Sequence, residues 1–255
     1  MRFDEKLKSG ITAFGTVVSF IDPTVTELLS PDLDFVWIDM EHSPQTVQTV
    51  QSHIMATMGS GITPLVRVAW NDAVLIKTVL DCGAAGVIVP MIRTPQDARM
   101  AVAACKYPPE GLRGFGPRRP SRYGRASGPG FCQKMNEEMI CIPQIEHVDA
   151  IRNIDAIVEV PGISSLVIGP NDLAGSMGHM GEPEHEEVAA AIDTVIASAK
   201  RATLAVGIGL GPDPRMIEAW IRRGMQWIAI GSDTSLLMHA LKTTMNSVAQ
   251  LGLLK

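Results

Sequence analysis

The chain of 255 residues lacks three features that would direct it to particular classes of protein. Its cysteines match no C-x-x-C spacing, which argues against a zinc knuckle or a redox pair and favours buried reduced thiols. No apolar run approaches the roughly 20 residues that are needed to span a bilayer. The net charge is -5, whereas nucleic-acid binding needs a basic face that displaces counterions. We therefore expect neither a membrane nor a nucleic acid as a partner.

The first residues, MRFDEKLKSG, are charged and lack the apolar centre of a secretory signal, so we expect a cytoplasmic protein. The sequence contains no internal repeat, low-complexity tract or linker that would separate two domains. Its length suits one large α/β domain. We expect residues 1–255 to form a single domain.

Short, β-branched apolar runs alternate along the chain with segments of helical spacing. We predict eight strands, the number that a closed (β/α)8 barrel requires, and a chain of about 250 residues suits this fold. A doubly wound open sheet is the alternative, because alternation alone does not distinguish the two. The predicted strands are 16–20, 35–38, 63–68, 86–90, 139–144, 165–168, 205–210 and 227–230, and the predicted helices are 73–80, 95–105, 148–158, 186–200 and 214–223.

The segment FVWIDMEH, residues 35–42, places polar chemistry directly after a predicted strand. Its apolar part is typical of a strand that is buried on both faces. Asp39, Glu41 and His42 then emerge where the loops of barrel enzymes form the active site. His42 is the candidate for proton transfer, because histidine is the side chain that titrates nearest to neutrality. We expect the other histidines to be surface residues: His53, His147, His179, His185 and His239.

Two carboxylates follow other predicted strands, Glu146 after MICIPQI and Asp172 after SSLVIGPN. Oxygen ligands of this kind suit a hard cation such as Mg²⁺ or Mn²⁺. The alternative is that both are helix caps or solvated loop residues. If a helix begins at or just after Asp172, its free N–H groups are also a place for an anion, unless the turn is a simple Asn or Asp N-cap.

Arg67 and Gln144 stand at the ends of two more predicted strands. An arginine in this position is costly to bury unpaired, so it faces either a carboxylate partner or a substrate oxyanion. Gln144 either donates a hydrogen bond into the same strand mouth or is a buried amide that is satisfied by the protein itself.

Six segments, in the same order along nearly the whole chain, resemble the HpcH/HpaI family of metal-dependent pyruvate aldolases. They are FVWIDMEH, PLVRV, LDCGA, KYPPEGLRGFG with a later YGR, PQIE and IGPNDL. The resemblance implies a (β/α)8 barrel, usually assembled as a trimer of dimers. It also implies cleavage of a 4-hydroxy-2-oxo acid into pyruvate and an aldehyde through a metal-bound enolate, with Mg²⁺, Mn²⁺ or Co²⁺ as the cofactor.

The resemblance also implies roles for the residues that hold metal and substrate. Glu146 and Asp172 would bind the divalent cation. Gln144 and the backbone at Asn171 and Asp172 would contact the substrate. The sequence departs from common family patterns at Met40 and at Asn171, both near the substrate, which affects selectivity more than chemistry.

By the same resemblance, Arg67 would stabilise the enolate oxygen and His42 would act as the base. Asp81 of LDCGA would raise the basicity of His42. Asp81 lies near the end of a predicted helix, away from the strand mouth of an isolated barrel. Either another subunit supplies it, or Asp39 is the partner of His42.

Five arginines crowd into the long irregular stretch 107–130, which is dense in Gly and Pro. These arginines could grip a distal carboxylate of a longer substrate, with residues 17–20 contributing to selectivity. They could equally be interface or surface residues. They are Arg113, Arg118, Arg119, Arg122 and Arg125.

Three rival functions differ in chemistry. A Schiff-base aldolase needs a lysine in the pocket, yet Lys77, Lys106, Lys134 and Lys200 fall in predicted helices or their flanks. A CoA-ester lyase of the citrate lyase β-subunit type would share the barrel and the metal carboxylates. A non-catalytic barrel would bind an oxo acid without needing a base.

Overall fold

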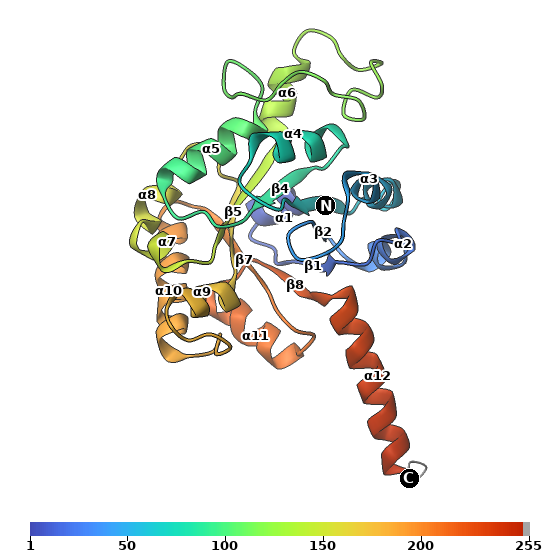
Figure 1. Ribbon diagram of the computed structural model, residues 1–255, viewed down its shortest axis with the longest axis vertical. Coiled ribbons are helices and arrows are strands. Elements are labelled where there is room, and N and C mark those ends of the chain that lie inside the picture. The colour runs from blue at the N-terminus through green and yellow to red at the C-terminus, as the bar shows by residue number, and fades with distance from the viewer. Residues whose placement is uncertain (252–255) are drawn as a thin grey trace.

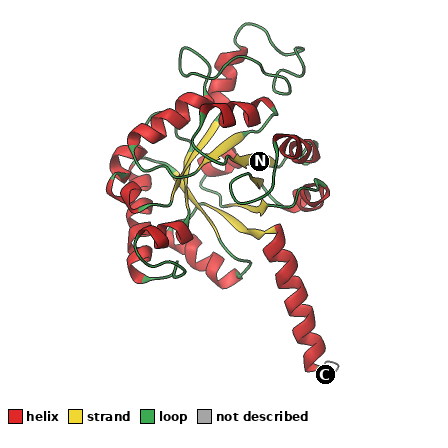
Figure 2. Cartoon of the chain, in the orientation of Figure 1, coloured by secondary structure: helices red, strands yellow, loops and turns green. Residues whose placement is uncertain are grey.

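The computed structural model describes residues 1–251, and its centre is a closed barrel of eight parallel strands (Figure 1 and Figure 2). Each strand pairs with the next one in sequence, and β8 pairs with β1. The prediction of a (β/α)8 barrel is therefore confirmed, and the open sheet is wrong. The strands are β1 (Ala13–Val18), β2 (Phe35–Asp39), β3 (Thr63–Arg67), β4 (Gly86–Val89), β5 (Ile140–Ile145), β6 (Ser165–Ile168), β7 (Ala205–Gly209) and β8 (Trp227–Ser232).

Helices cover the outside of the barrel (Figure 2). The helix predicted over 148–158 is two helices, α7 and α8, that meet at Asn153, where φ is -105° and ψ is 6°. The helices are α1 (Phe3–Lys8), α2 (Thr24–Leu29), the 3-10 helix η1 (Ser30–Asp32), α3 (Val47–Ala56), α4 (Ala73–Asp81), α5 (Pro95–Cys105), α6 (Phe131–Glu138), α7 (Val148–Arg152), α8 (Ile154–Val158), α9 (Pro170–Ser176), α10 (Glu186–Arg201), α11 (Pro214–Arg223) and α12 (Asp233–Gln250).

The inside of the barrel is filled by alternate residues of the strands. Phe35 and Trp37 of β2 belong to the inner apolar cluster, whereas the residues between and after them pack under the helices. Phe3 of α1 closes the N-terminal end of the barrel, with its ring centroid 5.2 Å from that of Phe35 and 5.5 Å from that of Trp227. Gly207 makes room for this packing, since a Cβ there would lie 2.0 Å from the Trp227 indole. This filled end leaves the C-terminal mouth for polar side chains.

The last helix, α12, extends away from the barrel (Figure 1). Its first residue, Asp233, is buried and accepts hydrogen bonds from the backbone N–H groups of Ser19 and Phe20, both at 2.8 Å. Further along, the helix exposes a set of apolar side chains: Leu237, Met238, Leu241 and Met245. Within residues 1–251, no helix combines the length and apolar character that crossing a membrane requires.

Candidate active site

An aspartate and an arginine pair across the C-terminal ends of two neighbouring strands. Asp39 ends β2, Arg67 ends β3, and the two residues are partners in the strand register. Because strand side chains alternate, Asp39 points inward like Trp37, and Arg67 points inward like Leu65. Arg67 Nε and Nη2 donate to the two carboxylate oxygens of Asp39 at 2.9 and 2.8 Å. Of the two alternatives for Arg67, the structure therefore provides the carboxylate partner, in bidentate geometry.

Burial and ion pairing shift the pKa values of Asp39 and Arg67 in opposite directions. Burial alone would raise the pKa of Asp39, but Arg67 and the backbone N–H groups of Glu41 and His42 together lower it below its usual value. Burial likewise opposes the charge of Arg67, but Asp39 and Glu41 raise the pKa of the guanidinium. Both partners are therefore ionised, and Arg67 is a fixed positive charge at the barrel mouth.

The sequence placed Glu41 at the mouth of the barrel but gave it no role in the site. Burial raises its pKa to about 7, against the charge of Arg67 and with a contribution from Glu146. Its Oε2 lies 3.0 Å from Arg67 Nη1 at an angle unsuited to a hydrogen bond, and has no hydrogen-bond partner within residues 1–251. The same oxygen lies 3.7 Å from His42 Nε2. A carboxyl group that titrates near neutrality can exchange a proton with such a histidine. Its only sequence signal is its position directly beyond a buried strand.

His42 stands at the rim of the mouth, with 62% of its side chain exposed. Asp39 accepts from its backbone N–H, but the oxygens of Asp39 face Arg67, so the carboxylate beside the ring is Glu41. Asp81 ends α4, next to the start of β4, and accepts a hydrogen bond from Arg113 Nη2 at 2.7 Å. Within one chain, the structure does not bring Asp81 to His42.

Glu146 and Gln144 extend the site across the barrel to the end of β5. Glu146 is 2% exposed, and its Oε1 accepts a hydrogen bond from the backbone N–H of Met91 at 2.6 Å. Its Oε2 accepts from Gln144 Nε2. Burial raises the pKa of Glu146, although both hydrogen bonds oppose the rise. Gln144 Oε1 is buried without a hydrogen-bond partner within the described part of the chain, so the alternative of a fully satisfied amide is wrong.

Asp172 and Asn171 lie in the first turn of α9, and both are exposed. The N-cap of α9 is Gly169, which offers no side chain, so the alternative of an Asn or Asp N-cap is wrong. A Cβ on Gly169 would lie 2.6 Å from Glu146 Oε2, so the loop after β6 packs directly on Glu146. The charge of Asp172 contributes to the raised pKa of Glu146, after burial. Of the two carboxylates, Glu146 is therefore buried and not a solvated loop residue.

The arginine-rich stretch lies at the other end of the barrel. The side chain of Arg113 is 1% exposed, pairs with Asp81, and has its guanidinium carbon 4.5 Å from the Tyr107 ring centroid. Arg113 and Arg119 line a cavity of about 460 Å³ that includes the starts of β3 and β5. This cavity is thus remote from the mouth. The other three arginines are exposed: Arg118, Arg122 and Arg125.

One histidine prediction is wrong. His53 on α3 is fully buried, with its Nδ1 2.8 Å from Thr26 Oγ1 and its Nε2 3.1 Å from Gln45 Nε2. Burial lowers the pKa of His53, so the ring is neutral and structural. Helical spacing did not reveal this because the polar partners come from α2 and from the loop before α3.

Known proteins resemble this chain over most of its length. A family model described as HpcH/HpaI aldolase/citrate lyase matches residues 14–240. A Shigella flexneri protein named 4-hydroxy-2-oxo-heptane-1,7-dioate aldolase is 39% identical over 241 residues, which cover 93% of this chain and 89% of that protein. A solved HpcH/HpaI aldolase/citrate lyase family protein from Burkholderia cenocepacia J2315 is 30% identical with a TM-score of 0.90, covering 96% of this chain and 98% of that one. A solved HpcH/HpaI aldolase from Desulfitobacterium hafniense DCB-2 is 27% identical with a TM-score of 0.87, and the match covers 97% of each chain.

Proposed function

Because the chain belongs to the HpcH/HpaI aldolase/citrate lyase family and is an aldolase, a carbon-carbon lyase, we propose that it cleaves a 4-hydroxy-2-oxo acid. The products would be pyruvate, or a close 2-oxo acid, and an aldehyde. The observation that supports this proposal most is the meeting, in one barrel mouth, of the fixed charge of Arg67, the buried Glu146 and the exposed His42. The same groups would serve the reverse condensation.

Glu146 and Asp172 are proposed to hold a divalent cation such as Mg²⁺, Mn²⁺ or Co²⁺. The residues fit this role, because hard cations prefer carboxylate and carbonyl oxygens. Burial raises the pKa of Glu146 despite its two hydrogen bonds, so a cation would stabilise its charge, and Gln144 Oε1 is a buried acceptor with no partner among the described residues. When bound, the cation would supply Lewis-acid polarisation of the substrate's keto group. Gln144 and the backbone at Asn171 and Asp172 would contact the substrate.

Arg67 is proposed to stabilise the charge that cleavage creates. When the C3–C4 bond breaks, its electron pair stays on the three-carbon fragment as an enolate. Asp39 holds the guanidinium through Nε and Nη2, so the group is oriented before the substrate arrives. A preorganised charge of this kind stabilises a developing oxyanion without reorganising during the reaction.

His42 is proposed to accept the proton of the C4 hydroxyl as the aldehyde forms, and to return a proton to C3 of the enolate. Within the chain, Glu41 lies 3.7 Å from the ring and is the group that can exchange this proton. Asp81 is proposed to support His42 only in an assembly, where a neighbouring copy brings its α4 end to the mouth. In that case the Asp81–Arg113 pair would orient the carboxylate.

The assembly is proposed to be a homo-oligomer, in the form of a trimer of dimers. The exposed apolar side chains of α12 support it, because a helix that projects from its own barrel leaves this surface to contact another copy. The Arg113 to Arg125 stretch would then contact either a distal substrate carboxylate across the interface or the neighbouring copy itself.

The test is a pyruvate-release assay over 4-hydroxy-2-oxo acids whose tails differ in length and charge. We expect activity that EDTA abolishes and that Mg²⁺, Mn²⁺ or Co²⁺ restores. Cleavage that is indifferent to chelation would contradict the proposed metal site. A preference for short, uncharged tails would argue against arginine recognition of a distal carboxylate.

Two further experiments test the rival activities. Cleavage of malyl-CoA in preference to oxo acids would identify a CoA-ester lyase. A lysine that gains the mass of pyruvate on borohydride reduction would identify a Schiff-base aldolase. The lysines named above lie on α4, α6 and α10 or at the end of α5, in the outer helical layer, which argues against the second rival.

A further inference from the structure

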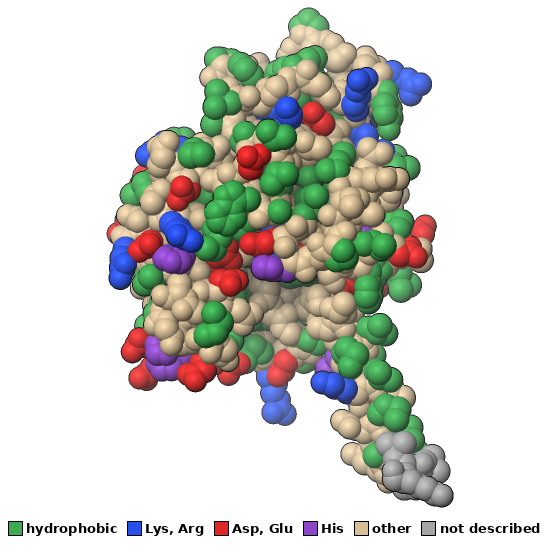
Figure 3. Space-filling view, in the orientation of Figure 1, with side chains coloured by type: hydrophobic (Ala, Val, Ile, Leu, Met, Phe, Trp, Pro, Cys, Tyr) green, Lys and Arg blue, Asp and Glu red, His purple; other side chains and the backbone are tan. Residues whose placement is uncertain are grey.

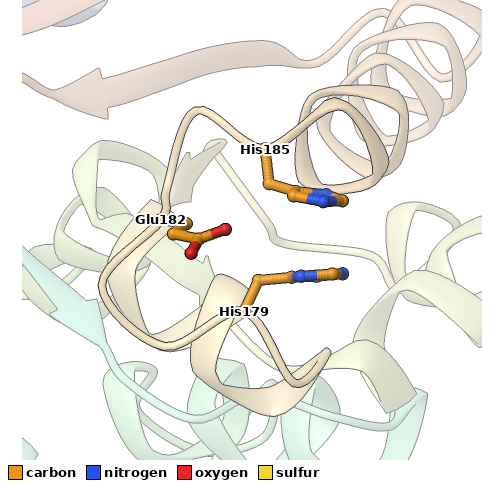
Figure 4. A group of neighbouring side chains, drawn as sticks. All are labelled: His179, Glu182 and His185. Atoms are coloured by element: carbon orange, nitrogen blue, oxygen red, sulfur yellow. The ribbon is translucent and has the colours of Figure 1, made fainter.

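Away from the barrel mouth, two histidines and a glutamate converge on the loop between α9 and α10 (Figure 4). His179, Glu182 and His185 each offer one ligand atom, and these atoms all lie within 4.8 Å of one another. We propose that this H-x-x-E-x-x-H segment is a second metal site, which binds a divalent transition ion such as Zn²⁺. The proposal does not rest on the aldolase reaction.

The backbone of the loop places the three side chains on one side. The N–H of Glu182 donates to the carbonyl of His179 at 2.9 Å, and the N–H of His185 donates to the carbonyl of Glu182 at 3.0 Å. Two successive turns of the same length therefore bring every third residue to the same side of the loop. Figure 4 shows the carboxylate of Glu182 directed toward the space between the two rings.

The loop is also fixed to the helix that precedes it. The N–H of His179 donates to the carbonyl of Ala174 at 2.8 Å, across Gly178, whose φ is +90°. Met180 packs where a Cβ on Gly175 would lie, only 2.5 Å from the Met180 Cε. The hydrogen bond to Ala174 and the packing of Met180 against Gly175 thus hold His179 in place without help from an ion.

A neighbouring glutamate contacts both imidazoles. The Glu187 carboxylate lies 3.1 Å from His179 Nε2, which leaves Nδ1 of His179 for an ion. The Glu187 backbone N–H donates to His185 Nδ1 at 3.3 Å, so the proton of the neutral ring is on Nε2, and an ion would take Nδ1 in place of this N–H. The contact of His179 is of the kind that metal-binding histidines commonly make with their second nitrogen, because it fixes the ring and its tautomer.

Binding requires a small rearrangement of the rings. His179 and His185 are stacked, with centroids 3.6 Å apart and planes at 15°. Since the lone pair of an imidazole lies in its ring plane, both rings must tilt so that their nitrogens converge. In a tetrahedral zinc site with bonds of about 2.0–2.1 Å, ligand atoms are about 3.4 Å apart. The exposed Glu182 is free to follow this closure.

The surroundings favour a cation of this class. Acidic and histidine side chains gather over this loop in Figure 3, at the lower left of the view. Nitrogen ligands select ions such as Zn²⁺, whereas the oxygen ligands of the barrel mouth suit Mg²⁺ or Mn²⁺. An ion here would join the end of α9 to the start of α10. It would thereby restrain α9, whose first turn carries Asp172.

The test is a Zn²⁺ titration of metal-stripped protein in excess Mg²⁺, which occupies the oxygen site, followed by calorimetry. We expect one Zn²⁺ per chain at the loop, and at least tenfold weaker binding in His185→Asn and in Glu182→Gln. Asparagine keeps an N-cap acceptor for α10, so His185→Asn removes the ligand and not the cap. The matched control is Glu184→Gln, which removes the same charge from the same exposed loop and is expected to bind Zn²⁺ like the wild type.

A second readout separates loss of the site from loss of the fold. Zn²⁺ in excess Mg²⁺ is expected to raise the Tm of the wild type and of Glu184→Gln, but not that of His185→Asn or His179→Gln. The proposal is wrong if the wild type takes up no Zn²⁺ under these conditions. It is also wrong if Glu182→Gln and Glu184→Gln weaken binding equally, because the loop would then attract cations by charge alone.

Discussion

The pKa values of Asp39 and Glu41, two residues apart in the chain, are shifted in opposite directions by their surroundings. Asp39 accepts hydrogen bonds from Arg67 Nε and Nη2 and from two backbone N–H groups, so its pKa is lowered despite burial. Glu41 is partly buried beside the same arginine, its Oε2 has no hydrogen-bond partner among the described residues, and burial raises its pKa to about 7. Paired groups whose pKa values diverge are typical of sites that divide charge stabilisation from proton transfer.

The bidentate pair makes a specific prediction for Arg67→Lys. Lysine keeps the charge but cannot hold Asp39 through two parallel hydrogen bonds, so the charge at the mouth is no longer oriented. We expect kcat for pyruvate release to fall by about 10²-fold, the scale of losing one oxyanion donor. Arg152→Lys is the control, because Arg152 pairs with Asp149 on the exposed surface of α7. Equal effects of the two substitutions would remove Arg67 from the mechanism.

Glu41 makes the stability of the metal-free protein depend on pH. Its folded pKa of about 7 lies above the ordinary value of 4.5, so the folded state holds a proton that the unfolded state releases. Its contribution is therefore fully present below about pH 4.5 and is lost as pH rises to about 7. Between these pH values we expect the free energy of unfolding to fall by about 1–3 kcal/mol less in Glu41→Gln than in the wild type. The measurement is urea unfolding at several pH values. A wild-type and variant pair with parallel pH curves would show that Glu41 titrates normally.

At the scale of elements, β5 and β6 build the carboxylate side of the mouth. The two-residue repeat of β5 carries Ile140 and Ile142 inward and then presents Gln144 and Glu146. The turn after β6 reaches Glu146 only because Gly169 has no side chain. The spacing between Glu146 and α9 is thus set by one glycine.

Gly169→Ala is expected to damage the site without unfolding the barrel. The new Cβ would lie 2.6 Å from Glu146 Oε2 and 2.8 Å from its Cβ, so the carboxylate or the turn must move. We expect a loss of about 10- to 100-fold in divalent metal affinity, as for other residues that support metal ligands. Gly209→Ala, at the end of β7, is the control, because a Cβ there meets no atom within 4 Å. Metal affinity that survives Gly169→Ala would place the ion elsewhere.

At the scale of the whole molecule, one chain is an incomplete version of the proposed enzyme. Asp81 is held by Arg113 at the end of the barrel opposite to His42. Helix α12 projects from the barrel with an apolar face in solvent. The homo-oligomer proposed above would explain both features, because further copies of the chain would cover the helix and could bring the carboxylate to a neighbouring mouth.

The assembly is tested by placing charge on the apolar face of α12. Leu237 and Leu241 lie one turn apart and are 59% and 50% exposed. We expect the double variant Leu237→Glu/Leu241→Glu to lower the molar mass measured by light scattering, because burying two carboxylates in an interface is costly. Thr243→Glu adds a charge on the opposite side of the same helix and is expected to leave the mass unchanged. An unchanged mass in the double variant would exclude this face as the contact.

Local pattern was sufficient for the barrel and for the inward direction of its polar residues. Eight apolar runs indicated eight strands, and the two-residue period that buries Phe35 and Trp37 also points Asp39 into the mouth. The same rule orients Arg67 and Gln144. These features could be predicted because each depends on residues that are neighbours in the chain.

Tertiary structure alone decided which groups meet across long sequence distances. The pKa of Glu41 depends on the enclosure of the mouth, the burial of His53 depends on Thr26 and Gln45, and Arg113 is fixed by Asp81. Desolvation and pairing are properties of a folded neighbourhood, so no spacing along the chain reports them. For that reason the sequence determined where chemistry can occur, while the fold decided the charge that each group carries there.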